Sequence, residues 1–399
     1  MKPSLRMHGL VQHINAVAQQ LGLDMLTVKK EYIFRTWITI SAPLTYAVFG
    51  VYWGFIEARR HWLEGIKSCI MLGGLVSGSA KLLTILLRHT PIRDLLYFII
   101  KICEDYEQRG VDFIHALNFG INRVYKIQRI IFVGYSITFL IMLLMPLVLL
   151  FYKGIRITVM PYEIPGLSID SNIGYGLTYL QHTVPEVVGG IGFYLGDMLV
   201  LLALNQIQTF ADIFQLKATA LNDALERKEQ SRYVCNVGEY KDFNIQALLM
   251  DLINWHQLFV EHTINFSYCE LVERIYDNLI AAQVFAASVS IVICLCVNLN
   301  EFDLISAIFF LVSAYSMSVY CIVGTQIEFA YDQVYQTVSC LSWHELNCEQ
   351  RKLYMMMLQR AQNMKIIVLL GIVPLSLGTA LQASELDFCF GSLLAKNNI

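Results

Sequence analysis

Long apolar stretches alternate along the chain with shorter segments that carry most of the charged residues. A helix that crosses a bilayer needs about 20 mostly apolar residues. Stretches of that length occur at 33–57, 65–87, 130–152, 187–210, 279–299, 304–327 and 366–384. The pattern therefore predicts an all-α membrane protein with seven transmembrane helices.

Helical patterns also continue beyond these stretches. Residues 243–299 contain no Gly and no Pro, and apolar side chains recur there with the helical period of 3.6 residues. The simplest interpretation is one continuous helix of about 57 residues, of which about 50 Å would project beyond the hydrocarbon core. Residues 328–346 and 349–364 are helical in pattern too. We expect these three arms to pack into a helical bundle outside the membrane, within one subunit or between subunits.

The segment between the third and fourth apolar stretches has a different character. Pro and Gly interrupt regular structure and mark turns. Residues 153–186 are rich in them, with Pro161, Pro165, Gly166, Gly174, Gly176 and Pro185 among them. We therefore expect an irregular lid over one face of the membrane domain.

The composition supports a membrane protein and argues against other classes. The 399 residues are 56% hydrophobic and 15% charged, against about 25% charged in an average soluble domain. So few charges cannot cover a soluble protein of this size, which excludes a cytosolic enzyme, a secreted disulfide scaffold and a nucleic-acid-binding protein as default readings. The net charge of −3 favours no polyanionic partner.

The basic residues lie mainly on one side of the predicted membrane. Of the 29 Lys and Arg residues, 22 fall in the N-terminal segment and in the loops after the second, fourth and sixth spans, and six fall on the other side. Because the cytosolic side carries the excess of Lys and Arg, the N-terminus is predicted in the cytosol and the C-terminus outside. This topology is the reverse of that of a G-protein-coupled receptor.

The predicted topology divides the chain into parts. They are a cytosolic N-terminal segment (1–32), six spans that include a cytosolic helical arm at 211–278 (33–327), cytosolic helices (328–365), and a seventh span with an extracellular tail (366–399).

Two charged residues lie well inside predicted spans, away from the span ends, where a charge is costly and is a candidate for function. Lys81 is in the second span and Asp197 near the middle of the fourth. The two side chains could pair, Lys81 could snorkel to the interface, and Asp197 could line a polar cavity. The sequence has no paired metal-binding histidines and no phosphate-binding loop, so we expect no enzyme activity, no cofactor and no metal.

Aromatic and Met side chains gather in the predicted outer halves of several spans. Such side chains can line an apolar pocket for a small volatile molecule, although ordinary packing between helices uses the same residue types. The candidate ligand-binding residues are Leu72, Phe139, Met142, Phe193, Tyr194, Met198, Phe309 and Tyr315.

The C-terminal quarter contains a series of short motifs. Residues 339–346 read SCLSWHEL, residues 351–357 read RKLYMMM, residues 360–362 read RAQ, and a terminal stretch with Ser and aromatic residues follows at 378–394. A Trp after a small residue, a basic pair, a Met-rich turn and an Arg-x-Gln element in this order resemble the insect odorant receptors. The seven spans, the reversed topology and the chain length agree with that family.

The resemblance implies a function and partners. Members are ligand-gated, non-selective cation channels of the plasma membrane of sensory neurons, in which an odorant-binding subunit and a common co-receptor form tetramers around a pore lined by the last span. The co-receptor has a large insertion between the fourth and fifth spans that is absent here, so the chain resembles the subunit that binds a small hydrophobic odorant. The alternatives are a gustatory-receptor-like channel, and a non-conducting seven-span receptor that signals through a cytosolic partner.

The same resemblance suggests roles for individual residues. The pocket is expected in the outer half, among the second, third, fourth and sixth spans. The predicted pore mouth and hydrophobic gate are Glu385, Asp387, Phe388, Phe390, Leu393 and Leu394, where the two acids would raise the local concentration of cations. The predicted anchor between subunits contains Trp343, Tyr354, Met355 and Leu358.

Overall fold

The computed structural model describes residues 2–27, 34–57, 59, 62–160, 162–234, 242–260, 268–300, 302, 304–363, 368–369 and 373–374. Helices dominate this part of the chain, and the predicted all-α class is confirmed. The elements are α1 (Pro3–Gln20), α2 (Phe34–Glu57), α3 (Trp62–Leu87), α4 (His89–Glu107), α5 (Val111–Lys153), α6 (Asn172–Val234), α7 (Asp242–Val260), α8 (Tyr268–Asn300), α9 (Leu304–Ser339), a 3-10 turn η1 (Trp343–Glu345), α10 (Cys348–Gln362), β1 (Val368–Leu369) and β2 (Val373–Pro374).

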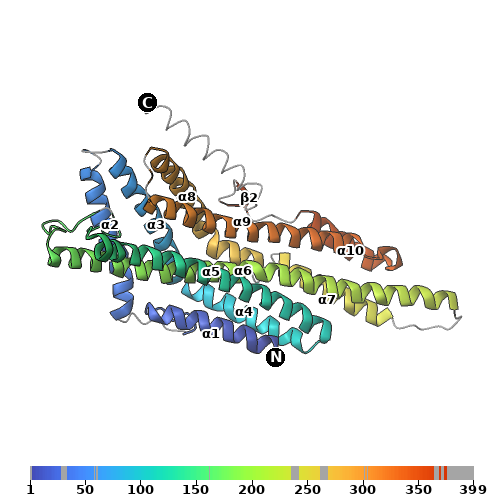
Figure 1. Cartoon of the computed structure of the whole chain (residues 1–399). Helices are drawn as coiled ribbons and strands as arrows, with labels where there is room; N and C mark the ends of the chain where they lie inside the picture. The colour runs from blue at the N-terminus through green and yellow to red at the C-terminus, as the bar shows by residue number, and fades with distance from the viewer. Residues whose placement is uncertain are drawn as a thin grey trace.

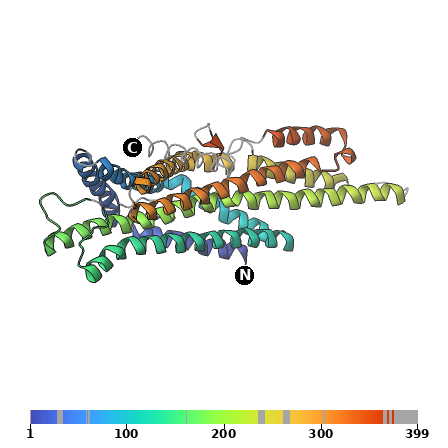
Figure 2. The ribbon, with the colours of Figure 1, turned by 45° about the horizontal axis from the view of Figure 1, so that its top comes forward.

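The centre of the molecule is α6, which has 63 residues and is therefore about 95 Å long. It runs the length of the structure between α5 and α9, as Figures 1 and 2 show. In its most apolar 18-residue window, 72% of the residues are buried, compared with 17% for α5 and 22% for α2. The outer helices therefore present most of their apolar side chains to the surroundings, as expected for helices that face lipid.

Five helices among the described residues are long and apolar enough to cross a membrane, namely α2, α5, α6, α8 and α9. They coincide with five of the predicted spans. A sixth, α3, coincides with the predicted span at 65–87 but contains a shorter apolar segment, Ser77–Leu87. Of the predicted seventh span, the structure describes only β1 and β2, which pair antiparallel rather than forming helical turns. The remainder lies outside the described residues, so the seventh helix stays a prediction.

The predicted continuous helix at 243–299 is wrong. The structure places two helices there, α7 and α8, and the two contact each other. The end of α7 and the start of α8 are eight positions apart in the chain. On one straight helix, residues eight or more positions apart are separated by about 12 Å or more, so the two segments could not contact each other if they formed a single helix. The absence of Gly and Pro predicted helical residues correctly but could not show that the chain changes direction.

The lid is shorter than predicted. The helix α5 ends at Lys153, and the Gly154 that caps it has a φ of 67°, in the left-handed region that favours Gly. The helix α6 begins at Asn172, where the Ser171 hydroxyl accepts a hydrogen bond from the Gly174 N–H at 2.9 Å as an N-cap does. Residues 172–186 are therefore helical, with Pro185 inside the helix. The described lid consists of residues 154–160 and 162–171.

The helices at the opposite end pack onto the extension of α6. The contacts join α7 to α6, and α10 to both α7 and α9, so the three predicted arms come together within one chain. Two further helices lie in segments for which only loops and a terminal segment were expected. They are α1 and α4, which pack on each other and bury an apolar stripe with helical spacing.

Candidate ligand-binding cavity

A cavity of about 130 Å³ lies between the helices near the lid. Residues of α2, α3, α5, α6, α8 and α9 line it, and Met160 of the lid completes its wall. An apolar cavity of about 150 Å³ in another protein binds benzene. The space is therefore suited to a small organic molecule with about one ring.

Aromatic and Met side chains form much of the cavity wall. Four of the candidate ligand-binding residues line the cavity, namely Phe139 and Met142 of α5, Phe193 of α6 and Phe309 of α9. Sequence reasoning did not single out Tyr46 and Tyr135, which also line it, nor did it expect contributions from α2 and α8. The wall is thus drawn from six helices rather than four.

Three other candidate ligand-binding residues, Tyr194, Met198 and Tyr315, do not line the cavity. Tyr194 is one position, or about 100° of helical rotation, from Phe193, and its hydroxyl accepts a hydrogen bond from Gln128 at 3.0 Å. Met198 is buried in the core, and Tyr315 packs edge-on against Tyr135 with ring centroids 6.3 Å apart. The side chain of Leu72 lies outside those that the structure describes.

Glycines make room for the rings around the cavity. A Cβ atom on Gly78 would lie 3.0 Å from the Phe193 ring, and one on Gly190 would lie 3.0 Å from the Phe139 ring. Both distances are tighter than ordinary van der Waals contact. These glycines therefore allow the helices to approach and the rings to turn toward the cavity, as small residues do between transmembrane helices.

Three polar residues in the cavity wall bond to one another. The Ser77 hydroxyl donates to the Gln283 carbonyl oxygen, and the Gln283 amide donates to the Ser316 hydroxyl at 2.9 Å. The chain of bonds joins α3, α8 and α9 and fixes the orientation of the amide. Sequence reasoning missed it, although a Gln within an apolar stretch is a detectable signal because a buried amide needs partners.

The two ionisable residues of the predicted spans form an ion pair behind the cavity wall. Lys81 Nζ lies 2.6 Å from an Asp197 carboxylate oxygen, and their side chains are 0% and 3% exposed. The hydroxyls of Tyr135 and Tyr320 both donate to the Asp197 carboxylate. Lys81 Nζ also lies 4.3 Å from the centroid of the Phe193 ring, a favourable cation–π distance. Because Tyr135 and Phe193 line the cavity, the ion pair supports two of its wall residues.

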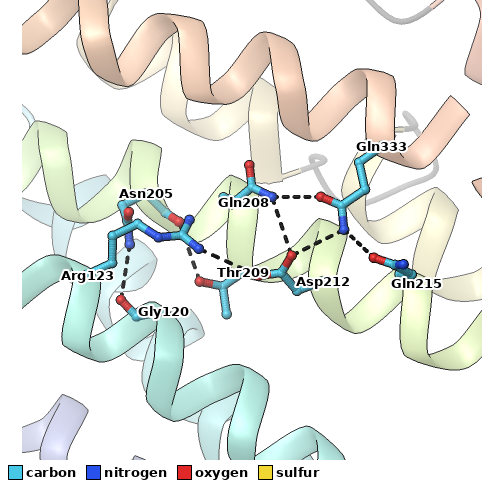
Figure 3. A network of polar contacts seen from close by, with 8 residues as sticks. All are labelled: Gly120, Arg123, Asn205, Gln208, Thr209, Asp212, Gln215 and Gln333. Carbon is cyan, nitrogen blue, oxygen red and sulfur yellow. Dashed lines mark hydrogen bonds and ion pairs between the residues drawn. The ribbon is translucent and has the colours of Figure 1, made fainter. Parts of the chain in front are cut away.

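A second polar network joins α5, α6 and α9 farther along α6. Asp212 lies 15 positions after Asp197, which corresponds to about 22 Å along the helix. It accepts hydrogen bonds from Gln208 at 3.4 Å and Gln333 at 3.2 Å, and lies 3.8 Å from Arg123. Figure 3 shows how these side chains converge from the three helices. Sequence reasoning did not identify this network.

The predicted anchor residues do not line the cavity. Trp343 is 47% exposed and stacks on the buried Tyr354, while Met355 of α10 is 61% exposed and Leu358 is half-buried. The six predicted pore and gate residues at 385–394 lie outside the described residues. The described residues contain no group of three or more His, Cys, Asp or Glu side chains that could hold a metal ion.

Membrane-length helices around a small, mostly apolar cavity define an α-helical membrane protein with a site for a small organic ligand. The family can be stated as well. The family model described as 7tm Odorant receptor matches residues 63–383, and the chain belongs to that family. It is therefore a membrane protein of a receptor family and not an enzyme.

Similar proteins support this assignment. The chain is 43% identical over 394 residues to "Putative odorant receptor 83c" of Drosophila melanogaster, covering 98% of each protein. Two structures of the olfactory receptor OR5 from Machilis hrabei share the fold. The complex with eugenol has a TM-score of 0.73 at 10% identity and covers 98% of this chain and 99% of that chain. The other has a TM-score of 0.71 at 9% identity and covers 98% of each chain.

Proposed function

We propose that the chain is the odorant-binding subunit of a heteromeric, ligand-gated, non-selective cation channel that assembles with a common co-receptor. The observation that carries the proposal is the cavity of about 130 Å³ between the helices, in a chain of the odorant receptor family. The eugenol complex of the Machilis receptor supports a small organic ligand for this fold. The odorant is a small volatile hydrophobic molecule.

In the proposed assembly the lid faces outward and the ends of α7, α9 and α10 lie in the cytosol. The distribution of Lys and Arg supports this orientation, since 22 of 29 fall on the arm side. The assembly lies in the plasma membrane of sensory neurons. Trp343 and Met355 offer exposed apolar surface on the arms for contact with a neighbouring subunit.

Binding of the odorant favours a conformation in which the last span moves outward and opens a hydrophobic gate. Phe388, Phe390, Leu393 and Leu394 form this gate in the proposal, and Glu385 and Asp387 attract cations to its mouth. The gate is tested with Phe390→Ala and Leu393→Ala. Currents of normal amplitude and normal ligand dependence in both variants would contradict this assignment.

The cavity is tested by filling it. Gly74 lines the cavity, and a Cβ atom there would meet its nearest neighbour at an ordinary 3.8 Å. Gly74→Leu therefore introduces a side chain that occupies much of the space while the helix gains intrinsic propensity. We expect the variant, expressed with the co-receptor, to reach the cell surface and to lose its odorant-evoked current.

Gly176→Leu is the matched control for this experiment. Gly176 is an exposed helical glycine of α6, and a Cβ atom there would have no neighbour within 4 Å. We expect this variant to retain its odorant-evoked current. Equal currents from the two Leu variants would contradict ligand binding in the cavity, and the absence of any odorant-evoked current from the wild type with a co-receptor would contradict the proposed function.

A further inference from the structure

The cavity wall contains one carboxyl group whose role the preceding sections leave open. Glu186 of α6 lines the cavity and is 7% exposed. Neither oxygen of its carboxyl group has a hydrogen-bond partner among the described residues. A buried polar group without a partner costs free energy, so this carboxyl group has unused capacity for a partner in the cavity.

The ionisable groups around Glu186 have other partners or none. The Tyr46 hydroxyl donates to Met160 Sδ at 3.0 Å, and the Tyr179 hydroxyl donates to the Leu143 carbonyl at 2.8 Å. Among the described residues that line the cavity there is no Lys, Arg or His. Lys81 is paired with Asp197, which lies 11 positions after Glu186 and thus about 16 Å away along α6. His182 is one turn before Glu186 on the same face, but its ring lies against Tyr162 at 4.3 Å, and neither of its nitrogens has a partner among the described residues.

Three other polar residues of the cavity wall are already engaged, and the hydroxyls of Ser79, Ser290 and Ser313 also line it. Ser77, Gln283 and Ser316 bond to one another, so a ligand would have to break an existing bond to reach them. The rings of Phe139 and Phe193 offer only apolar surface. Among the described residues of the cavity wall, Glu186 is the one with two buried polar atoms that have no hydrogen-bond partner, whereas Ser79, Ser290 and Ser313 each offer a single hydroxyl.

We propose that Glu186 is the polar anchor of the cavity and that it selects small apolar molecules carrying a hydrogen-bond donor, either a hydroxyl or an amine. The donor binds the Glu186 carboxyl group, and the apolar body of the molecule packs against the aromatic wall. A ligand without a donor leaves the carboxyl group buried and unpaired. Because a buried unpaired polar group costs free energy, the site discriminates strongly against such a ligand. This inference rests on the proposed function and names the ligand class of the same cavity.

The test compares ligands that share one skeleton. Cells that express the full chain with the co-receptor are exposed to 2-phenylethanol, 2-phenylethylamine, the methyl ether of the alcohol, and ethylbenzene. The corresponding six-carbon aliphatic series provides a second skeleton. We expect at least one donor-bearing compound to act at a concentration about tenfold or more below that of its matched ether, because the ether accepts hydrogen bonds but cannot donate them.

Three variants assign the preference to Glu186. Glu186→Leu should remove the advantage of the donor-bearing compound over its ether. Glu186→Gln keeps an acceptor but no charge, so it should retain a preference for the alcohol and lose one for a protonated amine; this arm distinguishes the two donors. Glu163→Leu is the matched control, because Glu163 is an acidic lid residue that does not line the cavity, and it should leave the preference unchanged.

The outcomes separate the two proposals. Currents that show no preference for donors in the wild type, or a preference that persists in Glu186→Leu, would overturn the role of Glu186 and leave the proposed function standing. No current from any compound, with the receptor labelled at the cell surface, would contradict both. Surface labelling of each variant shows whether a loss of current reflects a loss of folded protein.

Discussion

The ion pair between Lys81 and Asp197 provides a quantitative test of how the cavity wall is supported. Its two charges are almost completely buried, and the hydroxyls of Tyr135 and Tyr320 donate to the carboxylate. The perturbation is Lys81→Met, which keeps an unbranched apolar side chain beside Gly196. Gly196 makes space for the side chain at position 81, because a Cβ atom on residue 196 would lie only 2.6 Å from Lys81 Cβ.

The expected loss follows from the geometry of the site. Removing one partner of a buried ion pair costs about 3–5 kcal/mol, because the remaining charge stays buried without compensation. Tyr135 and Tyr320 still donate to Asp197, so we expect the lower end of this range, about 3 kcal/mol. A chain of 399 residues has an unfolding entropy of about 0.8 kcal/mol/K. The substitution should therefore lower Tm by about 4 °C.

The assay is thermal unfolding of the purified receptor in detergent. Lys101→Met is the matched control, because Lys101 is an exposed lysine of α4, and its Tm should match that of the wild type. The double variant Lys81→Met/Asp197→Asn removes both charges and keeps an acceptor for the two tyrosines, so it should recover most of the loss. The reasoning would be refuted by a Lys81→Met variant as stable as the wild type, or by a double variant less stable than Lys81→Met alone.

Three further predictions concern the segments outside the membrane helices. Burial lowers the pKa of His256 to about 4; the unfolded chain binds a proton near pH 6.5, so Tm should fall as the pH decreases from about 6.5 toward 4. His256→Phe should flatten this slope in a pH series of unfolding curves, whereas the exposed control His8→Phe should not. Gly22→Ala should destabilise by about 1–2 kcal/mol, since φ is +75° and the added Cβ would meet the α2 backbone at 2.7 Å; an unchanged Tm would contradict this strain. Asn347→Ala breaks the reciprocal hydrogen bonds with Gln350 that begin α10 and should cost about 1 kcal/mol, measured as faster proteolysis of α10 in limited digestion.

The sequence predicts where apolar helices occur but not how far they extend. The predicted span at 33–57 matches α2 closely, because a run of apolar residues of bilayer length has few alternative structures. The predicted span at 187–210 captures less than half of α6. Its extensions are polar enough to resemble loops, and they are helical because α5, α7 and α9 pack against them. Such tertiary contacts are not visible in local patterns.

The cavity was predictable by region and by residue type. Aromatic and Met side chains in the outer halves of the spans were the predicted candidates. Four of them, Phe139, Met142, Phe193 and Phe309, line the cavity. Glu186 was placed at the end of an irregular lid, because Pro and Gly residues recur through residues 153–186. Its position in the wall depends on α6 continuing through Pro185 and on the rotation of that helix relative to its neighbours, which a single sequence does not define.

The positions of Pro and Gly along α6 indicate which part of the helix bends most easily. Pro185 cannot donate a hydrogen bond to the preceding turn, and Gly189, Gly190 and Gly192 follow within seven residues, so this part of the helix resists bending least. Residues 197–234 contain no Gly and no Pro and behave as a rod about 57 Å long. A change of about 5° at the flexible part would move the far end of the rod by about 5 Å. The cavity borders the flexible part, whereas the network in Figure 3 clamps the rod to α5 and α9. Under the proposed function, a ligand that shifts α6 at the cavity would therefore move α5 and α9 together with the rod, because the network holds the three helices to one another.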